Sequence, residues 1–351
     1  MIWTPLLLSD PSPCLRWLVL RHLFQYPEDH AEVVELSGLR ESDPLATEIL
    51  AFQEGDGSWK PYALSEGRAG GNRILSTAFA LARLGYLGFD CRHPAVARGA
   101  TYLFAQQRED GSWPLPAQVE TGDEGSEPSS REGYSMMPLQ TAFPLRGLAA
   151  CGYAADPRAE RAYDWLLAQR LSDGAWPTGM ASGVYGYVAG YRRLAHSRWG
   201  CRSNTTGSLI CLGLHPSRRT SPEARRALDL LLGRETQEES ALGYEVARLV
   251  GAERVRGFIT FFARFDLALI LNLCSRVGVS REDERLDALL EFVRRQQGPY
   301  GLWEYPTRPQ VSRWLTFDIL RSLTHLDENG DWFSLEPRTP FQTYPRHPKR
   351  F

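Results

Sequence analysis

The chain has 351 residues, of which 43% are hydrophobic and 23% are charged, and its formal net charge is −2. This near balance lacks the basic surplus of nucleic-acid-binding proteins, and no apolar run approaches the roughly 18 residues needed to span a bilayer. The six cysteines are scattered without a C-x-x-C pair, which is typical of reduced thiols. The composition therefore predicts a cytoplasmic protein with no nucleic-acid partner and no transmembrane segment, for which peripheral membrane contact remains open.

Two kinds of predicted helix alternate along the chain. One kind is apolar on nearly every side, as buried helices are, and the other carries Arg and Glu on one face, as surface helices do. In chain order the apolar helices cover 12–24, 74–88, 137–153, 204–216, 261–278 and 312–326, and the amphipathic helices cover 43–53, 93–107, 156–170, 221–235 and 282–297. No stretch alternates with the period of two that is typical of strands.

A short repeat follows four of the amphipathic helices and joins a glutamine to a tryptophan through Gly. Its members are Gln53 and Trp59, Gln107 and Trp113, Gln169 and Trp176, and Gln296 and Trp303. The spacing from Trp176 to Trp303 is about twice the spacing between the earlier repeat tryptophans, which predicts a degenerate copy near Gln237. Such internal periodicity is typical of stacked supersecondary units.

The alternation predicts an all-α fold, specifically an α/α toroid with about six inner helices ringed by five to six outer helices. We expect one domain over 1–351, because no linker interrupts the repeats, and two helical domains are the alternative. The polar stretch 114–135 is rich in Pro, Ser and Gly and predicts a mobile loop. The segment 327–351 has no periodicity and predicts an irregular C-terminal end.

The Gln-to-Trp repeats resemble the QW repeats of squalene and oxidosqualene cyclases and the related repeats of protein prenyltransferase β subunits. The resemblance covers Gln53 to about Thr324, and it suggests a small, single-domain bacterial branch of the terpenoid cyclase and prenyltransferase superfamily. It implies a structural role for the repeat residues: the Gln caps a helix, the Trp packs on it, and together they tie the outer ring.

The catalytic motifs of these relatives are missing from the sequence. It has no Asp-x-Asp-Asp acid motif and no Asp-x-Cys zinc pair, since Asp90 and Cys91 are adjacent. The string "EDERLD" (282–287) weakly resembles the Asp-Asp-x-x-Asp magnesium motif, but it opens a surface helix, where acids stabilise the helix dipole. We therefore expect no metal and no cofactor, with Mg²⁺ considered only if the ligand is a diphosphate.

Polar and aromatic residues cluster where the inner helices are predicted to begin. Parallel inner helices would bring these ends to one mouth, where dipoles and Arg side chains favour an anion such as a diphosphate. The predicted ligand-binding residues are Arg73, Gln140, Tyr187, Trp199, Arg202, Asn204, Thr205, Arg264, Arg313 and Trp314. The alternative interpretation is that Thr and Asn cap helices here and that Arg–Asp pairs, such as Arg313 with Asp318, join neighbouring helices.

Asp266 and Asp318 are the predicted catalytic residues. Each is a carboxylate inside an otherwise apolar inner helix, where an unpaired charge is costly. Such a group either pairs with Arg or has a raised pKa and can donate a proton. A buried protonated Asp is what an alkene-protonating cyclase requires.

Three functions follow from these expectations. The first is an enzyme that binds an isoprenoid or similar apolar ligand in a central cavity and cyclises or transfers it. The second is a non-catalytic toroid that binds a lipid, a peptide or a protein. The third is a carbohydrate-active toroid, which would need paired carboxylates such as Asp266 and Asp318.

Overall fold

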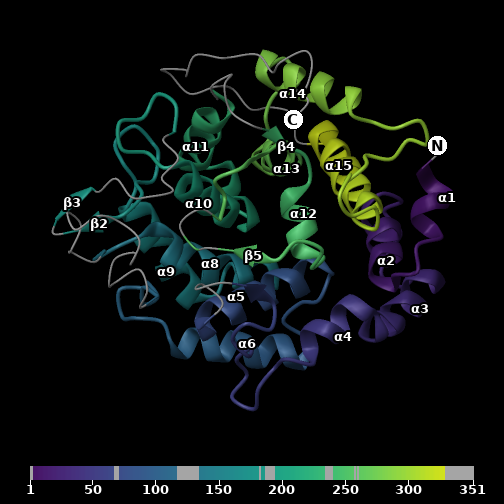
Figure 1. The fold of residues 1–351 in the computed structure, drawn as a ribbon, viewed down its shortest axis with the longest axis horizontal. Helices are drawn as coiled ribbons and strands as arrows, with labels where there is room; N and C mark the ends of the chain where they lie inside the picture. The colour runs from purple at the N-terminus through teal and green to yellow at the C-terminus, as the bar shows by residue number, and fades with distance from the viewer. Residues whose placement is uncertain are drawn as a thin grey trace. The chain divides into compact units, whose positions relative to one another are not determined.

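A computed structural model describes residues 3–66, 71–116, 134–181, 183–185, 194–233, 240–256, 258 and 261–328. Within these residues nearly all regular structure is helical, and the expected all-α class is confirmed (Figure 1). The chain forms two compact units. Unit 1 comprises 1–48, 232–253 and 265–351, and unit 2 comprises 49–231 and 254–264. Three predicted features lie wholly or partly outside the described residues. They are the degenerate repeat near Gln237, residues 117–133 of the loop and residues 329–351 of the C-terminal segment.

Unit 2 consists of an inner and an outer row of helices. The inner helices are α5 (Arg73–Tyr86), α8 (Pro138–Ala150) and α10 (Arg202–Leu214), and the outer helices are α6 (Pro94–Ala105), α9 (Pro157–Ala168) and α11 (Pro222–Leu232). All residues of α8 from Pro138 to Ala149 are buried, as its all-round apolar sequence predicts. In α9, Asp156 caps the N-terminus ahead of Pro157, and only one face of the helix is buried.

The inner helices of unit 2 run parallel to one another. Near their starts, Leu139 of α8 contacts Asn204 of α10, and near their ends Gly85 of α5 meets Ala150 of α8. A Cβ on Gly85 would lie 2.6 Å from the Ala150 carbonyl oxygen, so glycine permits this close approach. The parallel arrangement that was expected for the helix starts is therefore present here.

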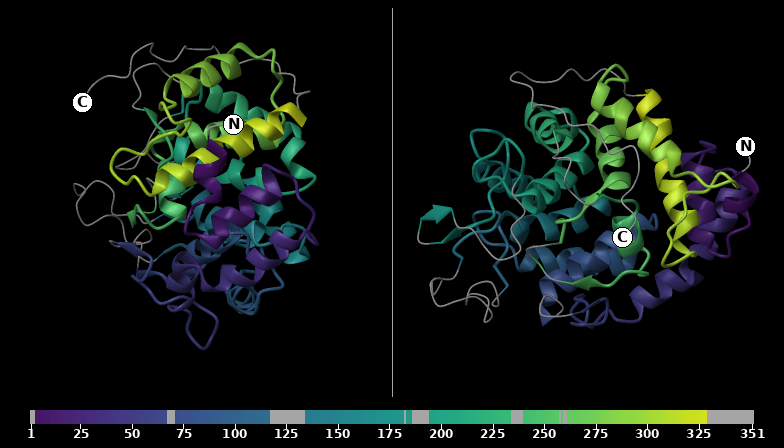
Figure 2. Two further views of the ribbon diagram at one scale, coloured as in Figure 1. Left: turned by 90° about the vertical axis from the view of Figure 1, so that its right-hand side faces the viewer. Right: turned by 45° about the horizontal axis from the view of Figure 1, so that its top comes forward.

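Unit 1 repeats the same two-layer organisation. Its elements are α1 (Trp3–Leu8), α2 (Pro13–His22), α3 (Ala31–Leu39), η1 (Arg40–Ser42), α12 (Tyr244–Leu249), α13 (Leu267–Val277), α14 (Glu284–Arg295) and α15 (Val311–Glu328), and α4 (Pro44–Leu50) begins in it. The apolar helices α13 and α15 pack together, with α2 beside α15 and the amphipathic α14 against α13 (Figures 1 and 2). The helix pairs expected of an α/α toroid are thus confirmed in both units.

Several elements differ from the sequence prediction. The helix expected over 261–278 begins only at Leu267, because Phe265–Asp266 (β6) pairs in parallel with Ser240–Ala241 (β4). Two more two-residue pairings occur, the parallel pair β1 (Ser65–Glu66) with β5 (Val255–Arg256) and the antiparallel pair β2 (Met180–Ala181) with β3 (Val184–Tyr185). The sequence did not predict α1, α3 and α12. In the described part of the chain, no helix is both long enough and apolar enough to cross a bilayer.

The repeat tryptophans hold each outer helix by one hydrogen bond. In every copy the indole Nε1–H donates to the carbonyl ten residues earlier, at 2.7–2.8 Å, from Trp59 to Ile49, Trp113 to Leu103, Trp176 to Leu166 and Trp303 to Val293. All four rings are buried. The structural interpretation of the tryptophans agrees with this geometry.

The repeat glutamine ties one outer helix to the next. Gln53 Nε2 donates to the carbonyl of Gly57 at 3.1 Å and to that of Ala95, in the first turn of α6, at 2.8 Å. Gln107 makes the equivalent bonds to Gly111 and to Arg158, in the first turn of α9. The amide therefore binds a carbonyl inside the next helix and does not cap its free N–H groups.

Two of the predicted repeat glutamines are one residue too early. Gln296 is the C-cap of α14, and it is Gln297 whose amide reaches the turn, at the Gly301 carbonyl, 2.9 Å away. Gln169 is likewise the C-cap of α9, and Arg170 takes the tying position with a 3.3 Å bond to the Gly174 carbonyl. The sequence has Gln-Gln at 296–297 and Gln-Arg at 169–170, and it does not show which residue of each pair binds the turn.

Candidate functional site

The polar residues at the starts of the inner helices of unit 2 bind the chain's own backbone. Asn204 Oδ1 accepts a hydrogen bond from the N–H of Leu139 at 3.0 Å, and its Nδ2 donates to the carbonyl of Thr178 at 3.2 Å. Thr205 Oγ1 accepts from the N–H of Trp176 at 3.0 Å. Both side chains are fully buried. Their hydrogen-bonding capacity therefore serves helix capping and the repeat, as the alternative interpretation held.

Gln140 and Arg202 are used in the same way. Gln140 Oε1 accepts from the N–H of Met137 at 2.8 Å, which completes a capping box at the start of α8, and its Nε2 donates to the carbonyl of Trp113 at 2.6 Å. The guanidinium of Arg202 is buried and donates to the carbonyl of Ala263 at 3.0 Å. These two residues join separate segments of unit 2.

The other predicted ligand residues of unit 2 do not converge. Arg73 is half exposed and pairs with Glu54 at 3.0 Å and with Asp56 at 3.4 Å. Arg264 is exposed, and Trp199 is partly buried with the Arg198 guanidinium 5.2 Å from its ring centroid. Tyr187 lies outside the described residues.

Phenylalanines fill the inner face of unit 2. Phe79 of α5 and Phe143 of α8 pack against Phe261, with ring centroids 6.3 and 4.6 Å away, and Phe143 stacks on Phe262 at 6.0 Å. All of these rings are buried, and the N–H of Phe262 is held by Ser203 Oγ at 2.9 Å. These aromatic side chains therefore form packed core on the inner face of unit 2.

Asp266 in unit 1 caps two helices at once. Its Oδ1 accepts from the N–H groups of Ala268, at the start of α13, and Gly243, at the start of α12, at 3.1 and 2.8 Å. Its Oδ2 accepts from the N–H of Glu245 at 2.6 Å. The residue is 4% exposed and precedes α13, so the expectation of a carboxylate inside the helix was wrong.

The charge state of Asp266 reflects two opposing effects. Burial raises the pKa of its carboxyl group, the hydrogen bonds from the backbone of Glu245 and Gly243 lower it, and the pKa lies at about 6. The group is therefore mostly ionised at neutral pH, and both oxygens accept hydrogen bonds. The Asp266 carboxyl group is therefore a poor proton donor.

Asp318 does lie within an apolar helix, α15, and it forms an ion pair there. Its partner is Arg321, one turn along the same helix, and both side chains are largely buried. Arg313 pairs instead with Asp10, Nη1 to Oδ2 at 3.1 Å, so the expected Arg313–Asp318 pair is wrong. Arg313 and Asp318 also share one helix and cannot join two.

Two predicted residues, Arg313 and Trp314, line a cavity of about 610 Å³ in unit 1. The cavity is bounded by the starts of α2, α4 and α15 and by the end of α12. Its lining residues are Asp10, Pro11, Ser12, Asp43, Pro44, Leu45, Glu48, Val250, Gly251, Ala252, Pro309, Gln310, Arg313 and Trp314. Half of these fourteen residues are proline or have an apolar side chain, and the volume suits a small organic ligand.

Sequence analysis missed most of this cavity. Asp43 caps α4, where its Oδ1 accepts from the N–H of Leu45 at 2.9 Å. Its Oδ2 also accepts from the N–H of Cys14, at the start of α2, at 3.1 Å and from the hydroxyl of Ser12. Pro11, Pro44 and Pro309 lie close ahead of or at helix starts, a pattern visible in the sequence, but no local signal brings these starts together.

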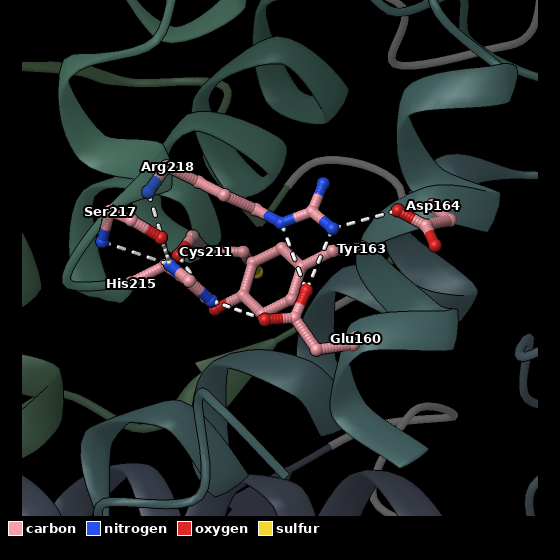
Figure 3. Close-up of polar contacts among 7 residues, drawn as sticks. All are labelled: Glu160, Tyr163, Asp164, Cys211, His215, Ser217 and Arg218. Atoms are coloured by element: carbon pink, nitrogen blue, oxygen red, sulfur yellow. Dashed lines mark hydrogen bonds and ion pairs between the residues drawn. The ribbon is translucent and has the colours of Figure 1, made fainter. Parts of the chain in front are cut away.

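A second polar cluster ties α9 to the end of α10, and its members are Glu160, Tyr163, Asp164, Cys211, His215, Ser217 and Arg218 (Figure 3). His215 Nε2 lies 2.8 Å from Glu160 Oε1, while its Nδ1 accepts from the N–H groups of Ser217 and Arg218, so the proton is on Nε2. Burial opposes ionisation of Glu160, but bonds from His215 and Arg218 lower its pKa overall. The cluster fastens the end of the inner helix α10 to the outer helix α9. Within the part of the chain that the structure describes, no group of three or more His, Cys, Asp or Glu side chains could hold a metal ion.

Comparison with known proteins finds similarity to squalene–hopene cyclases. Residues 32–190 match the family model of the squalene-hopene cyclase C-terminal domain. The squalene–hopene cyclase of Zymomonas mobilis is 30% identical over 151 residues, which is 43% of this chain and 21% of that protein. The squalene–hopene cyclase of Bradyrhizobium diazoefficiens is 34% identical over 126 residues, 33% of this chain and 18% of that protein. The chain thus spans about a fifth of the length of these relatives.

Among solved structures, the type II terpene cyclase MstE from Scytonema aligns with 81% of this chain and 96% of its own, at 16% identity and a TM-score of 0.34. A likeness of this size supports no conclusion about fold or ligand. The sequence matches confirm the resemblance to the terpenoid cyclases that the repeats indicated, since residues 32–190 are similar to the squalene-hopene cyclase C-terminal domain.

Proposed function

We propose that this protein binds an isoprenoid or similarly apolar chain in the cavity of unit 1. The observation that supports the ligand class is the match of residues 32–190 to a domain of squalene–hopene cyclases, enzymes whose name identifies an isoprenoid hydrocarbon as substrate. The match includes Asp43, Pro44, Leu45 and Glu48 of the cavity wall.

The chemistry of the wall supports the same ligand class. The buried ring of Trp314 forms part of the wall, and Leu45, Val250 and the three prolines add aliphatic surface with few rotatable bonds. An apolar chain that leaves water for this surface gains the hydrophobic transfer free energy, about 25 cal/mol per Å² buried. The polar groups lie at the helix starts, where they can orient one end of a ligand.

A second candidate is binding without catalysis, and the contacts of the two predicted acids favour it. Asp266 accepts three backbone hydrogen bonds and Asp318 is paired with Arg321, and neither residue lines the cavity. Catalysis remains a proposal, whether it is a cyclisation that proton transfer starts or a group transfer. It would require one of these carboxylates to reach the ligand. The carbohydrate-active alternative also stays a prediction.

The binding proposal is tested with substitutions that fill the cavity or leave it unchanged. Leu45→Trp places a large ring in the cavity, and Leu39→Trp adds the same ring on the exposed face of α3. We expect farnesol to bind the wild type and the Leu39→Trp variant equally, and the Leu45→Trp variant about tenfold more weakly, by native mass spectrometry and tryptophan fluorescence. Equal binding to all three proteins, or to none, would overturn the proposal.

Catalysis is tested on the same proteins. Squalene, farnesyl diphosphate and geranylgeranyl diphosphate are incubated with the protein, with and without Mg²⁺, and the extracts are analysed by mass spectrometry. Binding without any new product supports the non-catalytic candidate. A cyclised or transferred product that disappears in Asp266→Asn or Asp318→Asn, while farnesol still binds, supports the enzyme.

A further inference from the structure

The charged side chains around the cavity of unit 1 are mainly acidic. Among the described residues, three carboxylates, Asp10, Asp43 and Glu48, line it, against the guanidinium of Arg313. Asp10 and Asp43 are almost fully buried, so water screens their charges weakly. Glu48 is exposed, three residues after Leu45 on the same face of α4.

The N–H groups that could bind an anion at the helix starts already have acceptors. At the start of α2, the N–H of Ser12 donates to Asp10 at 2.9 Å and the N–H of Cys14 donates to Asp43 at 3.1 Å. At the start of α4, the N–H of Leu45 donates to Asp43 at 2.9 Å. Carboxylates of the chain therefore occupy the positions that a phosphate would take at these helix starts.

The cation that the described residues contribute to the wall is also neutralised within the wall. Arg313 Nη1 lies 3.1 Å from Asp10 Oδ2, and Asp10 is held in turn by the N–H of Ser12. A bound diphosphate would share this guanidinium with Asp10 and would face two further carboxylates. The electrostatics of this cavity oppose an anion and favour a cation.

From this charge arrangement we infer that the cavity selects an apolar ligand with a positively charged head, such as a prenylated amine, over an isoprenoid diphosphate. The inference rests on the proposed function and narrows its ligand class. The ammonium group lies towards Glu48 and Asp10, and the apolar chain lies on Leu45, Val250 and Trp314.

Three probes with the same fifteen-carbon chain test this selection. Farnesylamine, farnesol and farnesyl diphosphate differ only in the head, and their Kd values are measured by isothermal titration calorimetry at low salt. We expect farnesylamine to bind about tenfold more tightly than farnesol, and farnesyl diphosphate to bind most weakly. Added salt should reduce the preference for the amine.

The outcomes separate the inference from the proposed function. If none of the three probes binds, the proposed function is wrong and the inference fails with it. If all bind equally, or if the diphosphate binds most tightly, the proposed function stands and the inference is overturned.

A pair of charge-neutralising variants locates the effect. Glu48→Gln removes one negative charge from the cavity wall, and Glu35→Gln removes the same charge from the exposed face of α3. We expect the ratio of the farnesol Kd to the farnesylamine Kd to fall about threefold in Glu48→Gln and to stay unchanged in Glu35→Gln. An equal fall in both variants would indicate net charge instead of this cavity, and would contradict the inference.

Discussion

At the scale of single residues, one threonine hydroxyl recurs beside the repeat tryptophans. Thr77, Thr205 and Thr316 lie in the first two turns of inner helices, and each accepts the backbone N–H of a repeat Trp at 2.9–3.0 Å. Thr141 has the corresponding place in α8, but its buried hydroxyl has no hydrogen-bond partner among the described residues. Valine has nearly the same shape as threonine, so replacing Thr205 and Thr141 by valine tests what the hydrogen bond contributes.

We predict that Thr205→Val lowers the free energy of unfolding by about 1–3 kcal/mol, because the buried N–H of Trp176 loses its acceptor. Thr141→Val should change it by less than about 0.5 kcal/mol, or raise it, because an unpaired buried hydroxyl is removed. Urea unfolding followed by tryptophan fluorescence measures both values. Equal losses in the two variants would show that the hydroxyl does not support the repeat.

Asp266 predicts a pH dependence of known sign. Its folded pKa of about 6 lies above the ordinary value of 3.8, so between pH 4 and 6 the folded state binds more protons than the unfolded state at this site. The site's contribution to stability therefore rises as pH falls through this window, by at most about 1.4 kcal/mol per pH unit. The unfolding free energy of wild type minus that of Asp266→Asn should increase from pH 7 to pH 4.5. A flat or decreasing difference would contradict the raised pKa.

At the scale of elements, the turn between each outer helix and its tryptophan requires glycine. Gly57 has φ +88°, and a Cβ there would lie 2.5 Å from the carbonyl oxygen of Arg98 in α6. Gly111 has φ +90°, and its Cβ would meet the Arg161 carbonyl of α9 at 2.4 Å. The repeat thus combines a left-handed turn with close contact to the next outer helix.

We predict that Gly57→Ala lowers the free energy of unfolding by about 2–4 kcal/mol, from the left-handed backbone and the backbone clash together. Gly183→Ala is the control, because Gly183 has φ +78° but no atom within 4 Å of the added Cβ. It should cost about 1–2 kcal/mol at most. If both variants lose the same stability, the contact with α6 contributes nothing.

At the scale of the whole molecule, the chain passes between the two units four times, at residues 48–49, 231–232, 253–254 and 264–265. Neither unit is therefore a continuous segment that could be released by one cut. We predict a single cooperative unfolding transition with coincident far-ultraviolet circular dichroism and fluorescence curves, as for one domain. Two separated transitions would favour the alternative of two helical domains.

The fold was largely predictable from the sequence because its signals are local. The apolar and amphipathic helices differ in hydrophobic period, and caps such as Asp156-Pro157 mark their starts within a few residues. The repeat tryptophans are recognisable because the indole of each donates a hydrogen bond to a carbonyl only ten residues earlier. The six-residue α12 was missed because its N-cap residue is Gly243, which has no capping side chain, and the cap comes from Asp266 in a distant segment.

The sequence by itself therefore determined the all-α class, the alternation of inner and outer helices, and the family resemblance. Only the tertiary structure decided the use of its polar residues. Asn204, Thr205 and Asp266 have the same local sequence signature whether they bind a ligand or another helix, because both tasks need a buried acceptor near free N–H groups. In the folded protein, N–H groups of distant segments donate to these residues, which therefore bind the chain's own backbone. The cavity beside Trp314 in unit 1 likewise exists only because four helix ends pack together.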